Sequence, residues 1–564
     1  MRFFMTALVS AAMLMSGPTL AQDRSLVQKD RMESKEVEET LIQGLLTLAD
    51  MRIRDRPGKD HPYFDSCSTG DGCRSILPFA DPRNRFGLPT PPLWPKIRNY
   101  PGEWASSIHA LTQLIKMPQG QAPVTVPDAN MFVTASILYP LVFVKEADKG
   151  PVRAMIEDAL TSIKYYKRGA GYSFWREQPS STAGYRVIGP LNIPHQILDV
   201  LTLAIRSARP IPPDHGAATR PGWVQAIADK SINPIGSESF FNIPSDADDT
   251  ALAMIAYRLF DPDSRAQVRE LAELVLKHRD VSRTFEDTRD GWKGKNSGAF
   301  LTWLKDESLP IREAFNSKDG IIPFGINNVD CVVNANVVFA LGLAGYGKHP
   351  AVTSTLGILN RAVDLESWPY CGLYYPHKMM FPYALTRAYR DGGLSHPGMK
   401  AAMGRLVVRL IADQKETRLR EPKRDGAFSG GADQTYDLAT ALAVNALLNI
   451  GREIPTKLGI AAGYDQAIAS GIKYLVSHKV LSDVRYPDAI EGLYQPGLRA
   501  ALWEPGLFFT ASVQRAAGWR SEGYTAAIAV EALAKYLLAW DRAEGGLHES
   551  GALSVQDGAL NFLD

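Results

Sequence analysis

The sequence has no excess of charge of either sign. It contains 62 Lys and Arg residues against 61 Asp and Glu residues, which gives a net charge of +1 over 564 residues, and it has no block of basic residues. Proteins that bind nucleic acids gather positive charge in one segment or on one face, so this balance argues against nucleic acid as a partner. It gives no support to any other polyanionic ligand either.

Long hydrophobic runs are also missing after the N-terminus. The best one, "ILYPLVFV" at 137–144, contains Pro140 and is far shorter than the roughly 20 apolar residues that span a bilayer. Residues 1–21, "MRFFMTALVSAAMLMSGPTLA", combine the basic Arg2 with an apolar middle and small residues near Ala21, the pattern of a secretory signal peptide. We therefore expect cleavage after Ala21 and a periplasmic or secreted protein, for which peripheral membrane contact stays open.

Cysteine is scarce, with four residues in the whole chain. Cys67 and Cys73 bracket the Gly-rich loop "CSTGDGC", which is short enough to close as a disulfide in an oxidising compartment, with free thiols as the alternative. Cys331 and Cys371 lie beside apolar or aromatic residues and are expected to be buried as small hydrophobic residues. Neither has the basic or histidine neighbours of a nucleophilic cysteine.

Strand-like alternation is almost absent after Trp104. Helical periods recur instead in four segments, at 105–117, 128–144, 150–167 and 193–208. This pattern predicts an all-α fold. Before it, a helix from residue 34 leads into a stretch rich in Pro, Gly and aromatic residues, which indicates an ordered irregular wrap.

A diffuse internal repeat runs through the helical part. Each unit has a Gly-containing aromatic turn, then an Asp about eleven or twelve residues on, then a helix of small apolar residues; it is clearest at 319–345 and 425–451. Residues 237–259 follow the same plan, and residues 517–540 keep the turn and the helix without the Asp. More polar helices with one apolar face lie between the units.

Alternating helices of these two kinds imply two layers. A helix that is apolar all round is buried on every side, whereas a one-faced helix is buried along one stripe. Stacked pairs of this kind form an open solenoid or a closed double ring, and turns gathered before the inner helices favour the closed form. We predict an α/α toroid at 231–564, preceded by a signal peptide at 1–21, an N-terminal helix and irregular wrap at 22–100 and an N-terminal helical region at 101–230.

Three carboxylates crowd one helix start of the repeat series. Asp246, Asp248 and Asp249 open the apolar helix of the unit at 237–259. One interpretation is structural, because Asp is favoured at a helix cap and in the first turn, where the helix end stabilises each charge by about 0.3–1 kcal/mol. The other is chemical, because burial and mutual repulsion raise the pKa of clustered acids, so that one of them keeps a proton it can donate.

Residues 246–251, "DADDTA", match the D-x-D-D-T-A signature of class II terpene cyclases of the squalene–hopene cyclase type, which the sequence therefore resembles. The resemblance implies an α/α toroid, a hydrophobic small-molecule substrate of isoprenoid type, and Asp248 as the general acid, held and polarised by Asp246 and Asp249. We expect no metal and no cofactor, because neither the D-D-x-x-D motif of class I cyclases nor the zinc set of protein prenyltransferases is found. The nearest match to the superfamily's Q-x-x-x-G-x-W repeat, at 514–523, has its Trp one residue early.

Candidate substrate contacts are aromatic side chains near the predicted turns and a few polar neighbours. The aromatic candidates are Phe240, Phe241, Trp303, Trp368, Tyr374, Tyr375 and Trp519. Aromatic faces stabilise a nearby cation, although most such residues form core in any helical protein. His377 is a candidate to orient or reprotonate the acids, and Asp330 and Asn334 lie at a repeat-equivalent helix start; a satisfied histidine, capping and inner-helix hydrogen bonding are the plainer interpretations.

Two other functions fit parts of the pattern. A periplasmic polysaccharide lyase or glycosidase on an α/α toroid would use paired carboxylates and aromatic platforms in an open groove. A non-catalytic envelope protein would bind a lipid or a protein partner and use the Asp cluster only as a cap or as a cation site. We favour the cyclase because three acids exceed what a helix cap requires.

Overall fold

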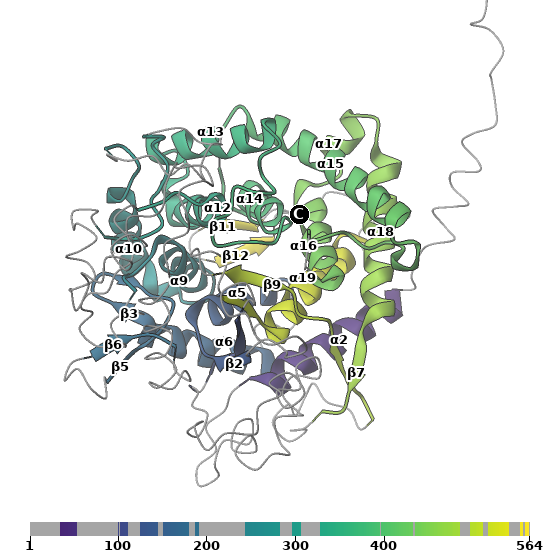
Figure 1. Cartoon of the computed structure of the whole chain (residues 1–564), viewed down its shortest axis with the longest axis horizontal. Coiled ribbons are helices and arrows are strands. Elements are labelled where there is room, and N and C mark those ends of the chain that lie inside the picture. Colours follow the sequence, from purple (N-terminus) through teal and green to yellow (C-terminus); the bar gives the residue numbers. More distant parts are fainter. Residues whose placement is uncertain are drawn as a thin grey trace, which may run out of the picture.

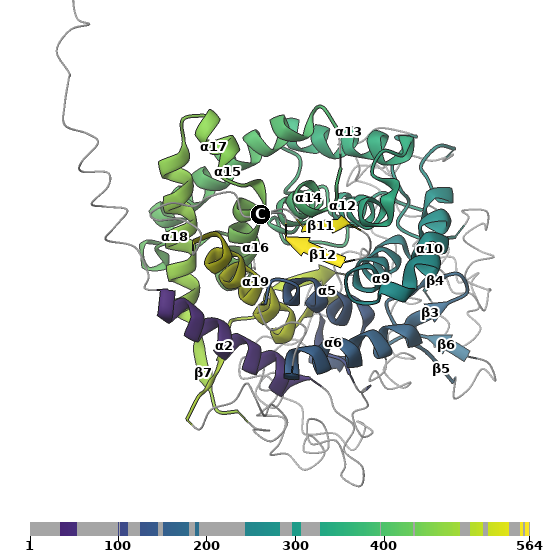
Figure 2. The ribbon, with the colours of Figure 1, turned by 180° about the vertical axis from the view of Figure 1, so that it is seen from behind.

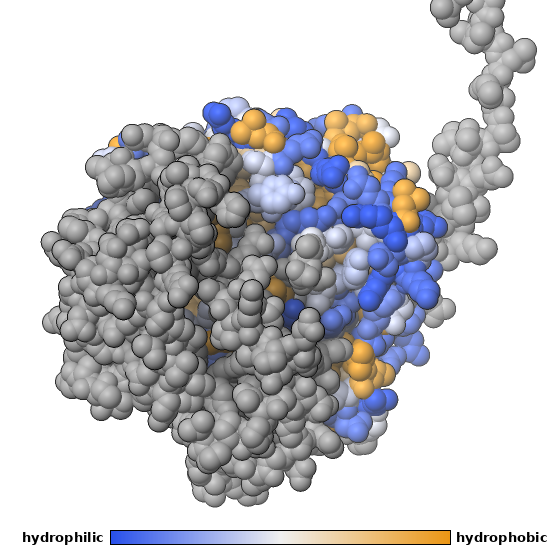
Figure 3. Space-filling model, viewed as in Figure 1, coloured by the Kyte–Doolittle hydropathy of each residue, from blue (hydrophilic) through white to orange (hydrophobic). Residues whose placement is uncertain are grey.

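The computed structural model describes most of the helical part of the chain. The described residues are 34–52, 100, 102–110, 125–144, 150–179, 186–190, 243–282, 296–305, 327–394, 396–431, 435–484, 497–510, 517–540, 553–556 and 559–562. None of the helices among them is long and apolar enough to cross a membrane. On the face drawn in Figure 3, the described surface is mostly hydrophilic, with hydrophobic residues in separate groups.

Six helices form an inner ring. They are α5 (Met131–Leu141), α9 (Ala247–Phe260), α12 (Cys331–Leu341), α14 (Met380–Asp391), α16 (Tyr436–Ile450) and α19 (Glu522–Trp540). Each packs against the next, and α19 returns to α5, which closes the ring (Figure 1). Every residue of α12 is buried, and so is every residue of α16 after Tyr436, which is half-buried, as their all-round apolar pattern predicts.

A second set of helices surrounds this ring (Figures 1 and 2). They are α2 (Ser34–Met51), α6 (Gly150–Ile163), α10 (Arg265–Lys277), α13 (Pro350–Asp364), α15 (Met399–Arg420) and α18 (Ala461–His478). Helix α2 packs on α19, α6 on α5, α10 on α9 and α13 on α12, while α15 and α18 both pack on α16. In α10 the buried residues are Val268, Leu271, Ala272 and Val275, the spacing of one helical stripe.

The predicted α/α toroid, with inner and outer helices, is confirmed by this arrangement. The four repeat segments supply α9, α12, α16 and α19, all of them inner helices. The ring also takes in α2, α5 and α6, which come from the segments 22–100 and 101–230. The short helix α17 (Glu453–Lys457) packs beside α15 and α18.

A four-stranded antiparallel sheet lies where a helix was predicted. The expected helix at 105–117 is wrong in its described part, because Ser106–Ala110 forms strand β1, which pairs with β2 (Thr125–Asp128) and with β10 (Ala517–Arg520). Strand β9 (Leu507–Thr510) completes the order β2-β1-β10-β9. Backbone partners more than 400 residues away in sequence override the local helical period, because strand formation depends on cross-strand packing.

The remaining strands form short two-stranded pairs. These are β3 (Lys167–Arg168) with β4 (Gly171–Tyr172), β5 (Glu177–Pro179) with β6 (Arg186–Ile188), β7 (Val480–Ser482) with β8 (Ala500–Leu502), and β11 (Leu553–Gln556) with β12 (Ala559–Phe562). The last pair lies across the centre of the ring beside α14 (Figure 2).

Cys331 and Cys371 form a disulfide, with their Cα atoms 5.6 Å apart. Both side chains are buried, but the prediction of two separate small hydrophobic residues is wrong, because they are bonded to each other across 40 residues of sequence. The bond ties the first residue of α12 to the loop that precedes α14. The predicted Cys67–Cys73 disulfide and the predicted signal peptide lie outside the described residues.

We expect the double variant Cys331→Ser/Cys371→Ser to be less stable than the wild type by about 2–4 kcal/mol, because a cross-link over a loop of this length restricts the unfolded chain. Urea unfolding followed by circular dichroism measures the difference. Adding a reductant should destabilise the wild type more than the variant. Equal unfolding free energies of the two oxidised proteins would contradict the prediction.

Candidate active site

The starts of three inner helices meet at one end of the ring. Backbone hydrogen bonds join the segments around them: Met131 N–H donates to Phe174 O (2.9 Å), Asp246 N–H to Tyr172 O (3.0 Å), Ala247 N–H to Thr302 O (2.7 Å) and Thr302 N–H to Asn328 O (2.8 Å). These backbone hydrogen bonds therefore hold the starts of α5, α9 and α12 next to one another. The Asp cluster lies within this joined end.

Asp246 is the N-cap of α9. Its backbone is extended, and its carboxyl accepts a hydrogen bond from the backbone N–H of Asp249 at 2.7 Å. This satisfies one of the free N–H groups at the helix start. The structural interpretation is therefore sufficient for Asp246.

Asp248 does not cap its helix. Its Oδ1 accepts a hydrogen bond from Asn336 Nδ2 of α12 at 2.8 Å, and its Oδ2 accepts one from the Tyr375 hydroxyl. The residue is 6% exposed, and both of its carboxyl oxygens accept hydrogen bonds from side chains outside α9. Asp248 therefore faces the neighbouring helix α12 and the segment that precedes α14.

Burial raises the pKa of all three acids. The pKa of Asp246 rises to about 7, and that of Asp249 rises well above its ordinary value, through burial first and then through the neighbouring Asp246 charge. Burial also raises the pKa of Asp248, while the hydrogen bonds from Tyr375 and Asn336 oppose that rise. The cluster therefore retains protons near neutral pH, as the chemical interpretation requires.

Arg387 of α14 reaches the cluster through Asn336. Its Nη2 donates to Asn336 Oδ1 at 2.7 Å, so one amide bridges the guanidinium and the Asp248 carboxyl. The Arg387 charge lowers the pKa of Asp248 and offsets part of the burial effect. A carboxylate left at Asp248 after proton donation is thus stabilised by two hydrogen bonds and one positive charge.

A small cavity lies next to this group, in the middle of the ring. Apolar side chains of α5, α9, α12, α14 and α19 form part of its wall, and Ser136, Asn336, Tyr383, Arg387 and Tyr524 supply polar atoms. The cavity is narrow, with room for about one water molecule. Five of the six inner helices therefore meet around a small space of mixed polarity, whose lining includes Asn336, the hydrogen-bond partner of Asp248.

The chain is similar in structure to type II terpene cyclases. Three variants of the type II terpene cyclase MstE from Scytonema match 78% of this chain and 92–93% of their own chains, at 14–16% sequence identity and with TM-scores of 0.37–0.39. One of them contains no ligand, and two are complexes with the substrate geranylgeranyl dihydroxybenzoate. No protein-family model and no curated protein matches the sequence.

Four of the predicted aromatic residues come together near the acids. Trp303 Nε1 donates to the Tyr374 hydroxyl at 3.1 Å, and Phe509 contacts the rings of Tyr374, Tyr375 and Trp519 at centroid distances of 5.2–5.9 Å. The Tyr375 hydroxyl donates a hydrogen bond to the carboxyl of Asp248, and the backbone of Trp303 forms an antiparallel bridge with Asp246. The others pack as a buried aromatic layer at this end of the ring.

Asp330 and Asn334 have structural roles. Asp330 is the N-cap of α12 and also accepts hydrogen bonds from the N–H groups of Leu373 and Tyr374, at 2.5 and 3.0 Å. Asn334 holds both backbone polar groups of Phe300, at 2.8 and 3.0 Å. Capping and hydrogen bonding within the inner helices therefore account for both residues. Asp330 also holds the backbone of the segment that leads to Tyr375.

The last predicted candidates do not join the acids. His377 is buried, its Nδ1 accepts a hydrogen bond from Met379 N–H at 3.2 Å, and burial lowers its pKa to about 3, so it is neutral. Trp368 is buried in the loop between α13 and α14, outside the described lining of the cavity. Phe240 and Phe241 lie outside the described residues.

Asp128 is a buried carboxyl at this end of the ring that the sequence analysis missed. Its carboxyl accepts hydrogen bonds from the indoles of Trp175 and Trp519, at 3.0 and 2.9 Å, and from Asn130 at 3.1 Å. Burial raises its pKa to about 7. It ties β2 to β10 and to the start of α5, and no local pattern around it signals these partners.

This carboxyl gives a stability prediction with a definite sign. A folded-state pKa above the unfolded value means that folding takes up a proton, so the contribution of Asp128 falls as the pH rises from about 4 to about 7. Asp128→Asn should make the slope of unfolding free energy against pH less negative between pH 5 and pH 7, by up to about 1.4 kcal/mol per pH unit. Urea unfolding at three pH values measures the slopes, and parallel slopes would contradict the prediction.

Proposed function

We propose that the protein is a cyclase that protonates a neutral isoprenoid or a related apolar lipid, with Asp248 as the acid and without a metal or cofactor. The observation that carries this proposal is the orientation of Asp248. Asp246 alone caps α9, whereas Asp248 is bound by Asn336 and Tyr375 beside the central cavity. Helix capping explains the Asp246 carboxyl but does not explain the Asp248 carboxyl.

The surroundings suit the protonation of an alkene. Alkenes are very weak bases, so the acid must be shielded from water and its conjugate base must be stabilised. Asp248 is nearly fully buried, and Tyr375, Asn336 and the Arg387 charge stabilise its carboxylate form. Phe132, Tyr383 and Tyr524 in the cavity wall offer aromatic faces to a carbocation.

The narrow cavity sets a condition for substrate entry. Because it has room for about one water molecule, a lipid must displace lining side chains. Met380 is among them, and Met changes rotamer at low cost. We expect this residue to move first.

Polysaccharide chemistry is the weaker alternative. It needs an open groove with exposed aromatic platforms, yet Trp303, Tyr375 and Trp519 are buried, at 3–7% exposure. Export remains part of the proposal. The Cys331–Cys371 disulfide supports it, because disulfides persist mainly in oxidising compartments.

The direct test uses the purified protein with geranylgeraniol and with squalene in D₂O. Proton donation by a solvent-exchanged carboxyl, followed by loss of a substrate proton, should give a cyclic product one mass unit heavier than the substrate, seen by gas chromatography and mass spectrometry. A cyclic product without deuterium would contradict an acid of this kind. Binding of both lipids without any product would favour the non-catalytic lipid-binding alternative.

A further inference from the structure

Three hydroxyl side chains line the cavity: Ser136, Tyr383 and Tyr524. The Tyr524 hydroxyl donates to the sulfur of Met380 at 3.4 Å, whereas the Tyr383 hydroxyl donates to the carboxyl oxygen Oε2 of Glu531 at 2.7 Å. Of these two tyrosines in the described lining, Tyr383 is thus the one whose hydroxyl donates a hydrogen bond to a carboxylate. A carboxylate can take the phenol's proton; a thioether cannot.

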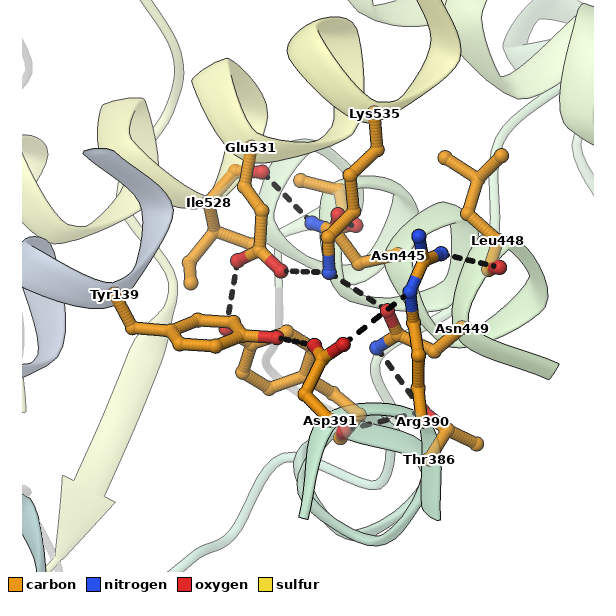
Figure 4. A network of polar contacts seen from close by, with 12 residues as sticks. Tyr139, Thr386, Arg390, Asp391, Asn445, Leu448, Asn449, Ile528, Glu531 and Lys535 are labelled. Atoms are coloured by element: carbon orange, nitrogen blue, oxygen red, sulfur yellow. Dashed lines mark hydrogen bonds and ion pairs between the residues drawn. The ribbon is translucent and has the colours of Figure 1, made fainter. Parts of the chain in front are cut away.

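Glu531 belongs to a buried polar network that joins α5, α14, α16 and α19 (Figure 4). Its other oxygen accepts a hydrogen bond from Lys535 Nζ at 2.6 Å, and Lys535 also donates to Asn449 Oδ1 at 2.6 Å. In Figure 4 the side chains of Glu531 and Lys535 leave the same helix and point toward Tyr139 and Asp391. Glu531 and Lys535 therefore form an ion pair within one helix.

This ion pair is fully inside the protein. The exposed fractions of the Glu531 and Lys535 side chains are 0% and 1%. Burying such a pair costs several kcal/mol of desolvation, and well-packed apolar residues often serve stability as well or better. Its presence in an otherwise apolar helix therefore favours a chemical use for the carboxylate.

Proton donation to an alkene creates a chemical requirement. The resulting carbocation must lose a proton or capture a nucleophile before a neutral product can leave. Asp248 lies on one side of Asn336 and Arg387, and Tyr383, one helical turn before Arg387 on α14, faces the same cavity. The Tyr383 ring lies 5.2 Å from the Arg387 guanidinium, which stands between the two oxygen groups.

We infer that Tyr383 and Glu531 form the proton acceptor that ends the reaction, an inference that rests on the proposed function. A C–H bond next to the cationic carbon breaks, and its electron pair forms the new C=C bond. The proton passes to the Tyr383 oxygen while the hydroxyl proton of Tyr383 moves to Glu531 Oε2. After product release, Glu531 gives this proton to water and Asp248 takes one from water, so the cycle balances.

The state of Tyr383 fits this role. Burial and the nearby Glu531 raise the pKa of Tyr383 well above its ordinary value, so the phenol is neutral at physiological pH. A neutral phenol is a poor base by itself. Its hydrogen bond to Glu531 lets it release one proton as it gains another, so no charged phenol is formed.

The experiment compares the full-length wild type with three variants. They are the single variant Tyr383→Phe, the double variant Glu531→Gln/Lys535→Met and the control Tyr464→Phe. Tyr464 is a buried tyrosine of α18 whose hydroxyl donates to the backbone carbonyl of Leu447 at 2.9 Å, away from the described cavity lining. Geranylgeraniol and squalene are the substrates, and thermal unfolding of each variant reports its folding. A second measurement is calorimetric binding of N,N-dimethyldodecylamine, whose protonated amine can donate to the Tyr383 oxygen as the cation would.

We expect Tyr383→Phe and the Glu531/Lys535 variant to form the wild-type product at least tenfold more slowly and to release products of water capture or of proton loss elsewhere. Tyr383→Phe should bind the amine at least fivefold more weakly, and Tyr464→Phe should match the wild type in both measurements. Unchanged product and unchanged amine binding in Tyr383→Phe would overturn the inference, even where Asp248→Asn is inactive and the proposed function stands. A wild type that neither converts the lipids nor binds the amine would overturn it as well, and retained turnover in Asp248→Asn would identify the proposed function as the failure.

Discussion

Asp248→Asn is expected to lower kcat by at least about 10³-fold, the upper part of the range for loss of a general acid. The amide has nearly the shape of the carboxyl but no acidic proton, so the cavity keeps its form while the donor is lost. Its NH₂ group would face one of the two donors that now bind Asp248, Asn336 Nδ2 or the Tyr375 hydroxyl. Because a phenol hydroxyl both donates and accepts, Tyr375 can turn its proton away, and we expect only a small change in unfolding temperature.

Asp437→Asn is the matched control for this variant. Asp437 is also the second residue of an inner helix, is also 6% exposed, and accepts hydrogen bonds from the Tyr474 hydroxyl at 3.0 Å and from Glu504 N–H at 2.8 Å. Its partners lie in α18 and in the segment after β8, outside the described lining of the cavity. The control should keep the wild-type kcat, measured with the same lipid substrates. Equal losses in both variants would mean that Asp248 acts through stability alone.

The helical ring is the part of the fold that the sequence predicts best. An inner helix such as α16 is apolar on every side and an outer helix such as α10 on one side, and both patterns are local. Strand β1 shows what a local sequence pattern cannot predict. Its partner β10 lies more than 400 residues further along the chain, and only the closed ring brings the two together.

The candidate site also has a part that local sequence predicts and a part that depends on packing between distant segments. The acids are visible in the sequence because they are neighbours, and the Asp246 cap follows from its place before a helix. The link from Asp248 to Asn336 and on to Arg387 crosses 88 and then 51 residues, so it depends on the packing of three helices. One signal was available locally: Glu531 and Lys535 stand four residues apart in the apolar segment 522–540, the spacing of a helical ion pair.

Glu531→Ala is expected to have the largest effect on stability, a loss of about 3–5 kcal/mol. The substitution leaves Lys535 buried with its hydrogen bond to Asn449 and without the Glu531 carboxylate, and a buried charge that loses its partner is strongly destabilising. Burial already lowers the pKa of Lys535, and loss of the carboxylate lowers it further, so part of the penalty is relieved as the pH rises. Urea unfolding at pH 6 and at pH 9 should therefore show a larger loss at the lower pH.

Two comparisons separate the buried charge from simple truncation. Glu416→Ala removes one partner of an exposed pair, since Glu416 and Arg409 are each 47% exposed, and should cost at most about 1 kcal/mol. Glu531→Leu combined with Lys535→Met removes both charges and should recover most of the stability lost in Glu531→Ala, because apolar residues often replace a buried ion pair without loss. If the double variant were as unstable as Glu531→Ala, the loss would come from the hydrogen bond that Glu531 accepts from Tyr383 rather than from the Lys535 charge. Recovered stability combined with a lost or altered product would instead mean that the charges in α19 are kept for the reaction and not for the fold.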